Sequence, residues 1–578
     1  MEDLEKNLTA DQFSAVRSDA QRLRILAGAG TGKTRVLTRR IAYQAKALRI
    51  DAQHSLCLTF SKRAALELQT RLNELGLGNL VTVGTFHSIA YAQLQARWSD
   101  LHITVEPKLL PNREKFFFSL LPNSFTAIER SFILNEINWC TAQRIAPTDY
   151  LATAEKTNRR DTVQHSIVSE YYRKFVNAKR QKNCIDFDDI LELAIQFLSE
   201  DTKYAAARHW KFQDLFVDEF QDVNPLQFAL LRSWLGTKSS LTVVGDPNQA
   251  IYSWNGADSS YLNDFGVYFP GSETIHLSQN FRSTPEILST ASLLLPSQVP
   301  LIANKPSGPL PTVRSESDEF TEAKSIAGKV MDIESGSGEW KNQAVLVRTH
   351  GQITSIVNAF TEKGIPFRVH TDSQTTSTDE NENAVRILTF HAAKGLEWRV
   401  VHVSGIEEGL TPIAHAINEA QQDEERRLMY VALTRAERQL HLSWARKRRF
   451  GIQRERKPSI FLKEISSVVT APPPISRMRA KKDLAKKIRE FRSKWREETI
   501  PNSVEPPLTN KLEALTKLRA SIAKVNDISP NSVFSDEVLE RLAIEMPDSR
   551  KQLKSISGLS PLITDRFGDQ ILALISEE

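Results

Sequence analysis

Short apolar runs recur along the chain and alternate with segments whose apolar residues repeat at helical spacing. These runs are brief and rich in leucine, isoleucine and valine, as expected of strands that are buried on both faces. In chain order they are residues 23–27, 214–218, 241–246, 273–277, 344–347, 365–369 and 384–390. Buried strands that alternate with helices predict two α/β units, each built on a parallel sheet.

Helical segments dominate two other parts of the chain. Residues 90–212 are charged and helical in character, and they interrupt the strands of the first unit. Ser535 and Asp536 resemble a helix N-cap before an apolar-periodic run, within a helical module near the C-terminal end. The predicted units are residues 1–89 with 213–285, an inserted helical subdomain at 90–212, a second α/β unit at 286–465, a basic linker at 466–508 and the helical module at 509–578.

The segment after the first apolar run has the composition of a phosphate-binding loop. Residues Gly28 to Thr34 read Gly-Ala-Gly-Thr-Gly-Lys-Thr and end in the G-K-[ST] signature, with a strand before them and a helix after them. Glycines let backbone N–H groups close around phosphates, and the helix N-terminus adds partial positive charge. We therefore expect Lys33 to reach the β- and γ-phosphates of ATP and Thr34 to bind Mg²⁺.

A second strand supplies the carboxylates that such a loop requires. The apolar run that ends at Val217 is followed directly by Asp218 and Glu219. Open α/β sheets bind their ligands at the carboxyl ends of the strands, so these side chains are expected beside the phosphate loop. We expect Asp218 to hold Mg²⁺ and Glu219 to activate the attacking water.

Further motifs accompany these two in a characteristic order. They are Leu8–Phe13, Leu58–Ala65, Gly84–Ser88, Val244–Ala257, Leu277–Thr284, His391–Trp398 and Glu424–Arg435. In these motifs the chain resembles superfamily-one DNA helicases of the UvrD/Rep/PcrA type, over roughly residues 8–445. The resemblance implies an α/β fold with two RecA-like parallel-sheet P-loop domains, an inserted helical subdomain, and ATP hydrolysis coupled to movement on DNA.

The resemblance also implies roles for single residues. Gln12 is expected to read the adenine edge, Phe281 to stack on adenine and Glu397 to hold the ribose. Arg282 and Arg435 are expected at the γ-phosphate, the latter as an arginine finger. The predicted catalytic residues are Lys33, Glu219, Gln249, Arg282 and Arg435. The predicted ATP contacts are Gln12, Gly28, Ala29, Gly30, Thr31, Gly32, Lys33, Thr34, Arg35, Phe281, Arg282, Glu397 and Arg435. The predicted DNA contacts are Phe60, His87, Tyr252, Trp254 and His391.

One motif places a polar residue close to two aromatic residues. Gln249 is expected to link the γ-phosphate to DNA, while Tyr252 and Trp254 are expected to stack on bases. Stacking a base on an aromatic ring is worth about 1–3 kcal/mol and tolerates any sequence, which suits a motor that passes every base. The alternative for both rings is ordinary packing in the protein core.

Several features distinguish the chain from the helicases that it resembles. Only a short polar segment, residues 371–383, stands where relatives usually insert a large helical domain. Phe281 replaces the more usual tyrosine, and Asn255 stands where many relatives have arginine. The module at 509–578 resembles an HRDC domain, the small helical accessory domain of several helicases. This combination resembles a branch of UvrD-like helicases found in actinobacteria.

Composition narrows the class of protein further. The net charge is only +5, but basic residues cluster between Arg477 and Arg496 and again at Arg446–Arg449. Such clusters are either solvated faces or surfaces that follow a phosphate backbone. The three cysteines lie far apart, and the sequence has neither a signal peptide nor a run of about 20 apolar residues. We expect a bacterial cytoplasmic, nucleoid-associated protein without a membrane partner.

Together these patterns predict a DNA helicase or single-stranded DNA translocase that uses ATP and Mg²⁺ in DNA repair or replication. Movement in the 3′→5′ direction is implied by the resemblance alone. The expected partner is single-stranded DNA, or a duplex with a 3′ single-stranded tail, bound by a monomer or a DNA-induced dimer. Two alternatives stay open: a translocase that displaces proteins and unwinds poorly, and a non-enzymatic DNA-binding scaffold. The intact Lys33 and Arg435 argue against the scaffold.

Overall fold

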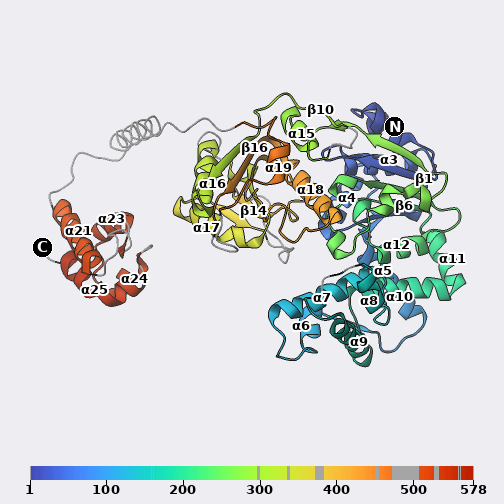
Figure 1. Ribbon diagram of the computed structural model, residues 1–578, viewed down its shortest axis with the longest axis horizontal. Coiled ribbons are helices and arrows are strands. Elements are labelled where there is room, and N and C mark those ends of the chain that lie inside the picture. Colours follow the sequence, from blue (N-terminus) through green and yellow to red (C-terminus); the bar gives the residue numbers. More distant parts are fainter. Residues whose placement is uncertain are drawn as a thin grey trace. The chain divides into compact units, whose positions relative to one another are not determined.

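The computed structural model describes residues 2–157, 159, 162–295, 300–334, 339–370, 383–448, 455–470, 507–525, 533, 534, 536–556, 559 and 561–576. The chain divides into two units, Met1–Pro472 and Pro473–Glu578, which we treat separately (Figure 1). The basic stretch from Arg477 to Arg496 and nearly all of the short segment 371–383 lie outside the described residues. None of the described helices combines the length and the apolar character that a membrane span requires.

The first sheet consists of six parallel strands in the order β3-β2-β6-β7-β1-β8. Its strands are β1 (Arg22–Ala27), β2 (Ser55–Thr59), β3 (Thr82–Thr85), β6 (Asp214–Val217), β7 (Ser240–Gly245) and β8 (Glu273–Leu277). The central strands are buried on both faces, which explains their unbroken apolar runs. The predicted strands at 23–27, 214–218, 241–246 and 273–277 are confirmed.

Two apolar clusters cover the two faces of this sheet. Strand β2 illustrates the alternation, because Leu56 and Leu58 belong to one cluster and Cys57 belongs to the other. The first cluster includes residues of α5 (Phe86–Asp100), α10 (Phe187–Glu200), α11 (Thr202–Lys211), α12 (Pro225–Trp234), α13 (Ser260–Asn263) and α14 (Phe265–Tyr268). The second includes residues of α1 (Glu2–Glu5), α2 (Ala10–Arg17), α3 (Lys33–Lys46) and α4 (Lys62–Glu74).

The helical segment between β3 and β6 contains an apolar core of its own. This core is formed by side chains of α6 (Arg113–Phe118), α7 (Ala127–Ala142), α8 (Tyr150–Lys156) and α9 (His165–Gln181). The short strands β4 (Lys108–Leu109) and β5 (Cys184–Ile185) pair beside it. Within the range predicted as inserted, α6 to α9 therefore pack together, whereas α5 and α10 pack on the first sheet.

The second sheet is also parallel, with the strand order β11-β16-β15-β12-β14-β13. Its strands are β11 (Thr312–Glu316), β12 (Gln343–Val347), β13 (Phe367–Val369), β14 (Val385–Thr389), β15 (Trp398–Val403) and β16 (Ala436–Ala445). Helices α16 (Glu319–Glu334) and α17 (Ile353–Glu362) pack against it through one cluster, and α15 (Pro285–Ser292), α18 (Glu419–Leu433) and α19 (Ile460–Glu464) through another. The predicted arrangement of two α/β bodies, each on a parallel sheet, is thus confirmed.

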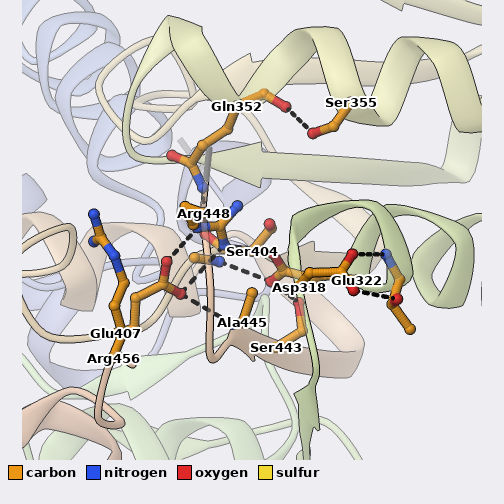
Figure 2. Close-up of polar contacts among 12 residues, drawn as sticks. Asp318, Glu322, Gln352, Ser355, Ser404, Glu407, Ser443, Ala445, Arg448 and Arg456 are labelled. Carbon is orange, nitrogen blue, oxygen red and sulfur yellow. Dashed lines mark hydrogen bonds and ion pairs between the residues drawn. The ribbon is translucent and has the colours of Figure 1, made fainter. Parts of the chain in front are cut away.

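Arg448, which follows β16, is buried between two carboxylates (Figure 2). Its guanidinium pairs with Glu322 on α16 at 2.5 Å and with Glu407 in the segment after β15. Glu322 also accepts hydrogen bonds from the Ser443 hydroxyl at 2.6 Å and from the Gly405 N–H at 3.0 Å. Burial alone would lower the pKa of Arg448, but the charges of both glutamates raise it. The alternative of a phosphate-following surface is therefore wrong for Arg448, which stabilises the second sheet.

The second unit is a small helical bundle. Its described helices are α21 (Pro507–Val525), α23 (Asp536–Glu545), α24 (Arg550–Ser555) and α25 (Pro561–Ser576). Leu515, Leu542, Leu553 and Ile571 are fully buried in its core, so each helix contributes one apolar face. The predicted N-cap at Ser535 lies outside the described residues, and α23 begins at Asp536.

Candidate functional site

Three adjacent strands bring polar segments to one edge of the first sheet. The glycine-rich loop follows β1, Asp218 follows β6 and Asp246 follows β7. Because β6, β7 and β1 are parallel neighbours, their carboxyl ends lie side by side. Counted back from Gly32, the first glycine of the phosphate-loop pattern falls on Ala27, so the match is complete except at that position.

The glycine-rich loop needs glycine where its backbone is left-handed and crowded. Gly30 has φ +68°, and a Cβ there would lie 2.6 Å from the side chains of Asn280 and Arg282. Asn280 in turn donates its side-chain amide to the Ala29 carbonyl at 2.6 Å. The Phe281 N–H donates to the Gly30 carbonyl at 2.8 Å. These contacts fix the loop to the segment that carries Phe281 and Arg282.

Lys33 lies at the N-terminus of α3 and faces the acidic edge of the sheet. Its ammonium is 3.1 Å from the Glu219 carboxylate. Burial by itself lowers the pKa of Lys33, but the charges of Glu219, Asp246 and Asp218 outweigh burial and raise it. Conversely, the charges of Lys33 and Lys394 hold the pKa of Glu219 below its usual range despite its burial. Lys33 is therefore charged in this acidic environment.

Glu219 has a strained backbone, which aims its side chain. Its φ of 52° and ψ of 40° are left-handed, a conformation that costs a non-glycine residue roughly 1–3 kcal/mol and clusters at functional sites. The Glu219 N–H donates to the Asp218 carboxylate at 3.0 Å, and Gln221 donates to the Glu219 carboxylate at 2.5 Å. The turn after β6 thus lets two consecutive carboxylates contact different partners: Asp218 contacts Thr34, and Glu219 contacts Lys33 and Gln221.

Thr34 and Asp218 supply the oxygens that would hold Mg²⁺. The Thr34 hydroxyl donates to the Asp218 carboxylate at 3.4 Å. Mg²⁺ prefers oxygen ligands and commonly takes one or two from protein, with water and phosphate oxygens completing the octahedron. Burial and the neighbouring Glu219 charge raise the pKa of Asp218, which a divalent cation would counteract. The pair fits Mg²⁺, although the described residues contain no group of three or more His, Cys, Asp or Glu side chains suited to a metal.

Two residues of the second sheet reach this site together. Glu397 directly precedes β15 and Arg435 directly precedes β16, and these neighbouring strands pair at Trp398 and Ala436. Glu397 forms an ion pair of 2.5 Å with Arg282. The Arg435 guanidinium is buried and lies 3.5 Å from the Gln249 side-chain oxygen. Burial and the nearby Arg282 charge lower the pKa of Arg435 to about 9. The structure thus brings Gln249, Arg282, Glu397 and Arg435 together.

Three further predicted ATP contacts, Gln12, Arg35 and Phe281, make contacts within the first unit. Gln12 is buried, donates its amide to the Thr31 carbonyl at 2.9 Å and accepts from the Thr9 N–H at 3.2 Å. An amide side chain retains one N–H and one lone pair after these two bonds. Arg35 donates to the Asn7 carbonyl at 3.1 Å. Phe281 is 38% exposed, which leaves part of its ring accessible for stacking.

Three predicted DNA contacts form an aromatic cluster. The ring centroids of Tyr252, Trp254 and His391 lie 6.2 to 6.4 Å apart. Trp254 is 60% exposed, so the core-packing alternative is wrong for this residue, whereas Tyr252 is half-buried. Burial and the charges of Arg348 and Lys394 lower the pKa of His391 to about 4, which keeps its ring neutral near pH 7. The cluster joins residues from both sheets.

Phe60 and His87 make their aromatic contacts elsewhere. Phe60 is half-buried and lies 6.1 Å from Phe86, while His87 lies 5.8 Å from Phe187. Phe187 is 54% exposed and was not among the predicted contacts. The sequence offers one indication that Phe187 is exposed. It lies between two aspartates, so it has no apolar neighbour on either side in the sequence.

Lys394 is a second residue to which the sequence motifs gave no role. Its ammonium pairs with Asp222 at 2.5 Å and donates to the Gln249 carbonyl at 2.6 Å. Asp222 is buried, and this burial raises its pKa to about 6. Lys394 precedes β15 and Asp222 follows β6, so the ion pair joins the two sheets. Sequence alone cannot reveal a pair whose members are 172 residues apart.

The sequence matches the profiles of three known domain families. The profile of the UvrD/REP helicase N-terminal domain matches residues 8–270, that of the UvrD-like helicase C-terminal domain matches 275–377 and 370–447, and that of the HRDC domain matches 509–575. The predicted resemblance of the C-terminal module to an HRDC domain is thereby confirmed.

The curated relatives that the chain matches are named as DNA helicases. The chain is 28% identical to the ATP-dependent DNA helicase UvrD2 of Mycobacterium tuberculosis over 691 aligned positions, covering 98% of each protein. It is 29% identical to the ATP-dependent DNA helicase PcrA of Staphylococcus epidermidis, covering 64% of this chain and 51% of the relative. Identity to DNA helicase II of Escherichia coli is 28%, covering 67% and 54%. Since 691 aligned positions exceed the 578 residues of this chain, the mycobacterial relative contains segments that this chain lacks.

Proposed function

We propose that this chain, which belongs to the UvrD/REP helicase family, is an ATP-dependent DNA helicase that moves along single-stranded DNA. One observation carries the proposal. Gln249 contacts Arg435 from the second sheet and lies three residues from Tyr252, an aromatic residue beside Trp254. A change at the nucleotide therefore has a short covalent path to rings that can stack on bases.

The chemistry we propose is hydrolysis of ATP between the two sheets. Lys33 binds the β- and γ-phosphates, and Glu219 accepts the proton of the attacking water. When bound at Thr34 and Asp218, Mg²⁺ neutralises phosphate charge. Transfer of Lys33 from Glu219 to a phosphate removes one of the two charges that lower the pKa of Glu219, so substrate binding makes this carboxylate a better base.

Arg282 and Arg435 complete this site from outside the glycine-rich loop. An arginine finger contributes roughly 10³–10⁵ in rate, so turnover depends on how the two sheets approach each other. Gln12, Arg35 and Phe281 bind the adenine side, and Glu397 binds the ribose. Such a site couples hydrolysis to a change in the relation between the sheets, and this change produces movement along DNA.

The finer proposal concerns substrate and direction. We propose 3′→5′ movement on single-stranded DNA or from a 3′ single-stranded tail, by a monomer or a DNA-induced dimer, in DNA repair or replication in a bacterial cytoplasm. Strand displacement from duplexes that carry either a 3′ or a 5′ tail tests this proposal. Unwinding of the 3′-tailed duplex alone is expected, and unwinding of the 5′-tailed duplex alone contradicts the direction.

A second candidate function is a translocase that displaces bound proteins and unwinds poorly. The observation that favours it is the length difference, because the mycobacterial relative has segments without counterparts here. Displacement of streptavidin from a biotinylated single strand, without strand separation on a matched tailed duplex, would favour this candidate. Absence of DNA-stimulated ATP hydrolysis would instead favour a non-enzymatic scaffold.

A further inference from the structure

The loop that carries Tyr252 and Trp254 is held by side chains of the second sheet's helix α18. We call residues 249–256 the stacking loop. The Glu424 carboxylate accepts a hydrogen bond from the Ser253 N–H at 3.0 Å and another from the Ser253 hydroxyl. Arg427 donates its Nε–H to the Ala250 carbonyl at 2.9 Å. Two side chains of one helix therefore hold the backbone on both sides of Tyr252.

Helix α18 connects these hydrogen bonds to the proposed nucleotide site. Glu424 and Arg427 are three residues apart, so they lie on the same face of the helix. Arg435 lies two residues beyond the C-terminal end of the helix, and the nine steps from Glu424 to Leu433 span about 14 Å at the helical rise. Glu424, Arg427 and Leu433 belong to one continuous helix, so we infer that they move together. A displacement that draws Arg435 towards a phosphate therefore also displaces Glu424 and Arg427.

The same helix is firmly attached to the second sheet. Glu425, the neighbour of Glu424, is buried and pairs with Arg348 at 2.5 Å. It also accepts a hydrogen bond from the Ile413 N–H at 3.1 Å. Arg348 directly follows β12, so α18 and the second sheet are tied by a charge-assisted contact.

The far end of the stacking loop is attached to a different body. Gly256 has φ +90°, and a Cβ there would lie 2.6 Å from the Ala142 Cβ at the end of α7. Gln143 donates its amide to the Gly256 carbonyl at 3.0 Å. The loop thus runs from contacts with α18 to contacts with the helical segment between β3 and β6. Relative motion of these bodies must be absorbed by the residues between them, which include Trp254.

We propose that Glu424 and Arg427 are positioning residues that transmit the nucleotide state at Arg435 to the aromatic rings of the stacking loop. This inference rests on the proposed function and adds the physical link between its two halves. Its consequence is thermodynamic. If one ligand moves α18 and the other binds the loop that α18 holds, then ATP and single-stranded DNA change each other's affinity by the same factor.

The test is the factor by which a non-hydrolysable ATP analogue changes the dissociation constant for a fluorescent oligothymidylate. This factor is measured for the full-length protein and for Glu424→Ala, which should bring it close to one. If the analogue changes the wild-type dissociation constant by about ten-fold, Glu424→Ala should remove that change. A ten-fold change is within the effect of losing a hydrogen bond to a charged group. Glu424→Gln keeps an acceptor for the Ser253 N–H and should retain most of the factor.

Matched variants separate the inference from general damage. Asp423→Ala changes an exposed carboxylate on the same helix and should retain the wild-type factor. Ser253→Ala removes the hydroxyl partner from the other side and should reduce the factor in the same direction as Glu424→Ala. If Glu424→Ala does not fold, Ser253→Ala carries the test. The double variant should be no worse than Glu424→Ala, because Glu424→Ala already removes both hydrogen bonds from Ser253.

The outcomes distinguish the inference from the function on which it rests. DNA-stimulated ATP hydrolysis in the wild type with an unchanged factor in Glu424→Ala and Ser253→Ala would overturn the inference alone. A wild-type factor of one would overturn it equally. Absence of DNA-stimulated hydrolysis in the wild type would overturn the proposed function. A factor that falls close to one in Glu424→Ala and falls part of the way in Ser253→Ala, with DNA-free hydrolysis within about two-fold of wild type, supports the transmission role.

Discussion

The Lys33 ammonium and the Glu219 carboxylate lie 3.1 Å apart, so the proposed phosphate ligand and the proposed base are paired with each other. We predict that Lys33→Ala abolishes ATP hydrolysis. Glu219→Gln should bind ATP but turn over about 10²–10⁴ times more slowly, the usual contribution of a general base. Steady-state phosphate release and nucleotide binding measure the two effects separately.

The control for these variants is Glu67→Gln, which changes an exposed glutamate on α4 that pairs only with a surface arginine in the described contacts. It should turn over like the wild type. Normal turnover in Glu219→Gln would show that Glu219 is not the general base, and Asp218 would then need to be tested in its place.

Arg435 is the second test of the site. We predict that Arg435→Ala lowers DNA-stimulated turnover by roughly 10³ and changes nucleotide affinity less. The guanidinium is buried and also donates to the Val431 carbonyl at 2.9 Å, so the variant's thermal unfolding must be measured alongside. Arg438→Ala, at an exposed position of β16, is the matched control. A change in affinity alone would show that Arg435 binds the ground state.

The fully apolar strands and the phosphate loop could be predicted from sequence because local physics determines them. A strand buried on both faces must be apolar along its length, as in β6 and β7, and a loop that approaches a phosphate needs residues such as Gly30. Adjacent parallel strands then bring their carboxyl ends together, which placed Asp218 beside Lys33. These inferences need no knowledge of distant contacts.

Other features depend on contacts between residues that are far apart in the sequence, and local sequence patterns do not predict such contacts. Arg448 is one of several arginines in a basic cluster, and only the positions of Glu322 and Glu407 make it a buried residue. The strands β11, β15 and β16 were not among the predicted runs, although β15 and β16 position Glu397 and Arg435. The ion pair of Lys394 with Asp222 likewise exists only after the sheets are placed together.

The exposure of Trp254 leads to a prediction about DNA binding. Because the ring is 60% exposed, Trp254→Ala should fold normally and lose about 1–3 kcal/mol of affinity for single-stranded DNA, the value of one stacked base. Fluorescence anisotropy with oligothymidylate measures the loss. The matched control is Trp210→Ala, which removes a tryptophan of α11 that is 66% exposed and should leave DNA affinity unchanged. Loss of the cooperative melt in Trp254→Ala would favour a packing role.

Arg448 leads to a prediction about stability. Replacing Arg448 by Met leaves Glu322 and Glu407 buried without their cation, and breaking such a pair typically costs about 3–5 kcal/mol. Urea denaturation should show a lower midpoint for this variant. Lys447→Met, at an exposed neighbouring position, should unfold like the wild type. If Arg448→Met instead kept its stability and lost DNA affinity, the residue would belong to a phosphate-binding surface after all.

The final prediction concerns removal of residues 471–578. The first unit remains intact up to Thr470, whose N–H donates to the Pro311 carbonyl at 2.9 Å, so the truncated chain should keep DNA-stimulated ATP hydrolysis. It should lose DNA affinity, because the basic stretch from Arg477 to Arg496 can neutralise phosphates, each adding to the dependence of binding on salt. If the HRDC domain also binds this DNA, the linker that joins it to the motor would raise the motor's effective concentration on the DNA.

The measurement is the dissociation constant for single-stranded DNA at several salt concentrations, for the full-length and the truncated chain. The truncated chain should bind more weakly at low salt and show a shallower slope of log affinity against log salt, since fewer counterions are released. A chain that lacks only residues 509–578 separates the basic stretch from the HRDC domain, because it should retain the slope and lose affinity. Equal affinities and equal slopes for all three chains would mean that the C-terminal region does not bind DNA, and a protein partner would then be the better assignment for it.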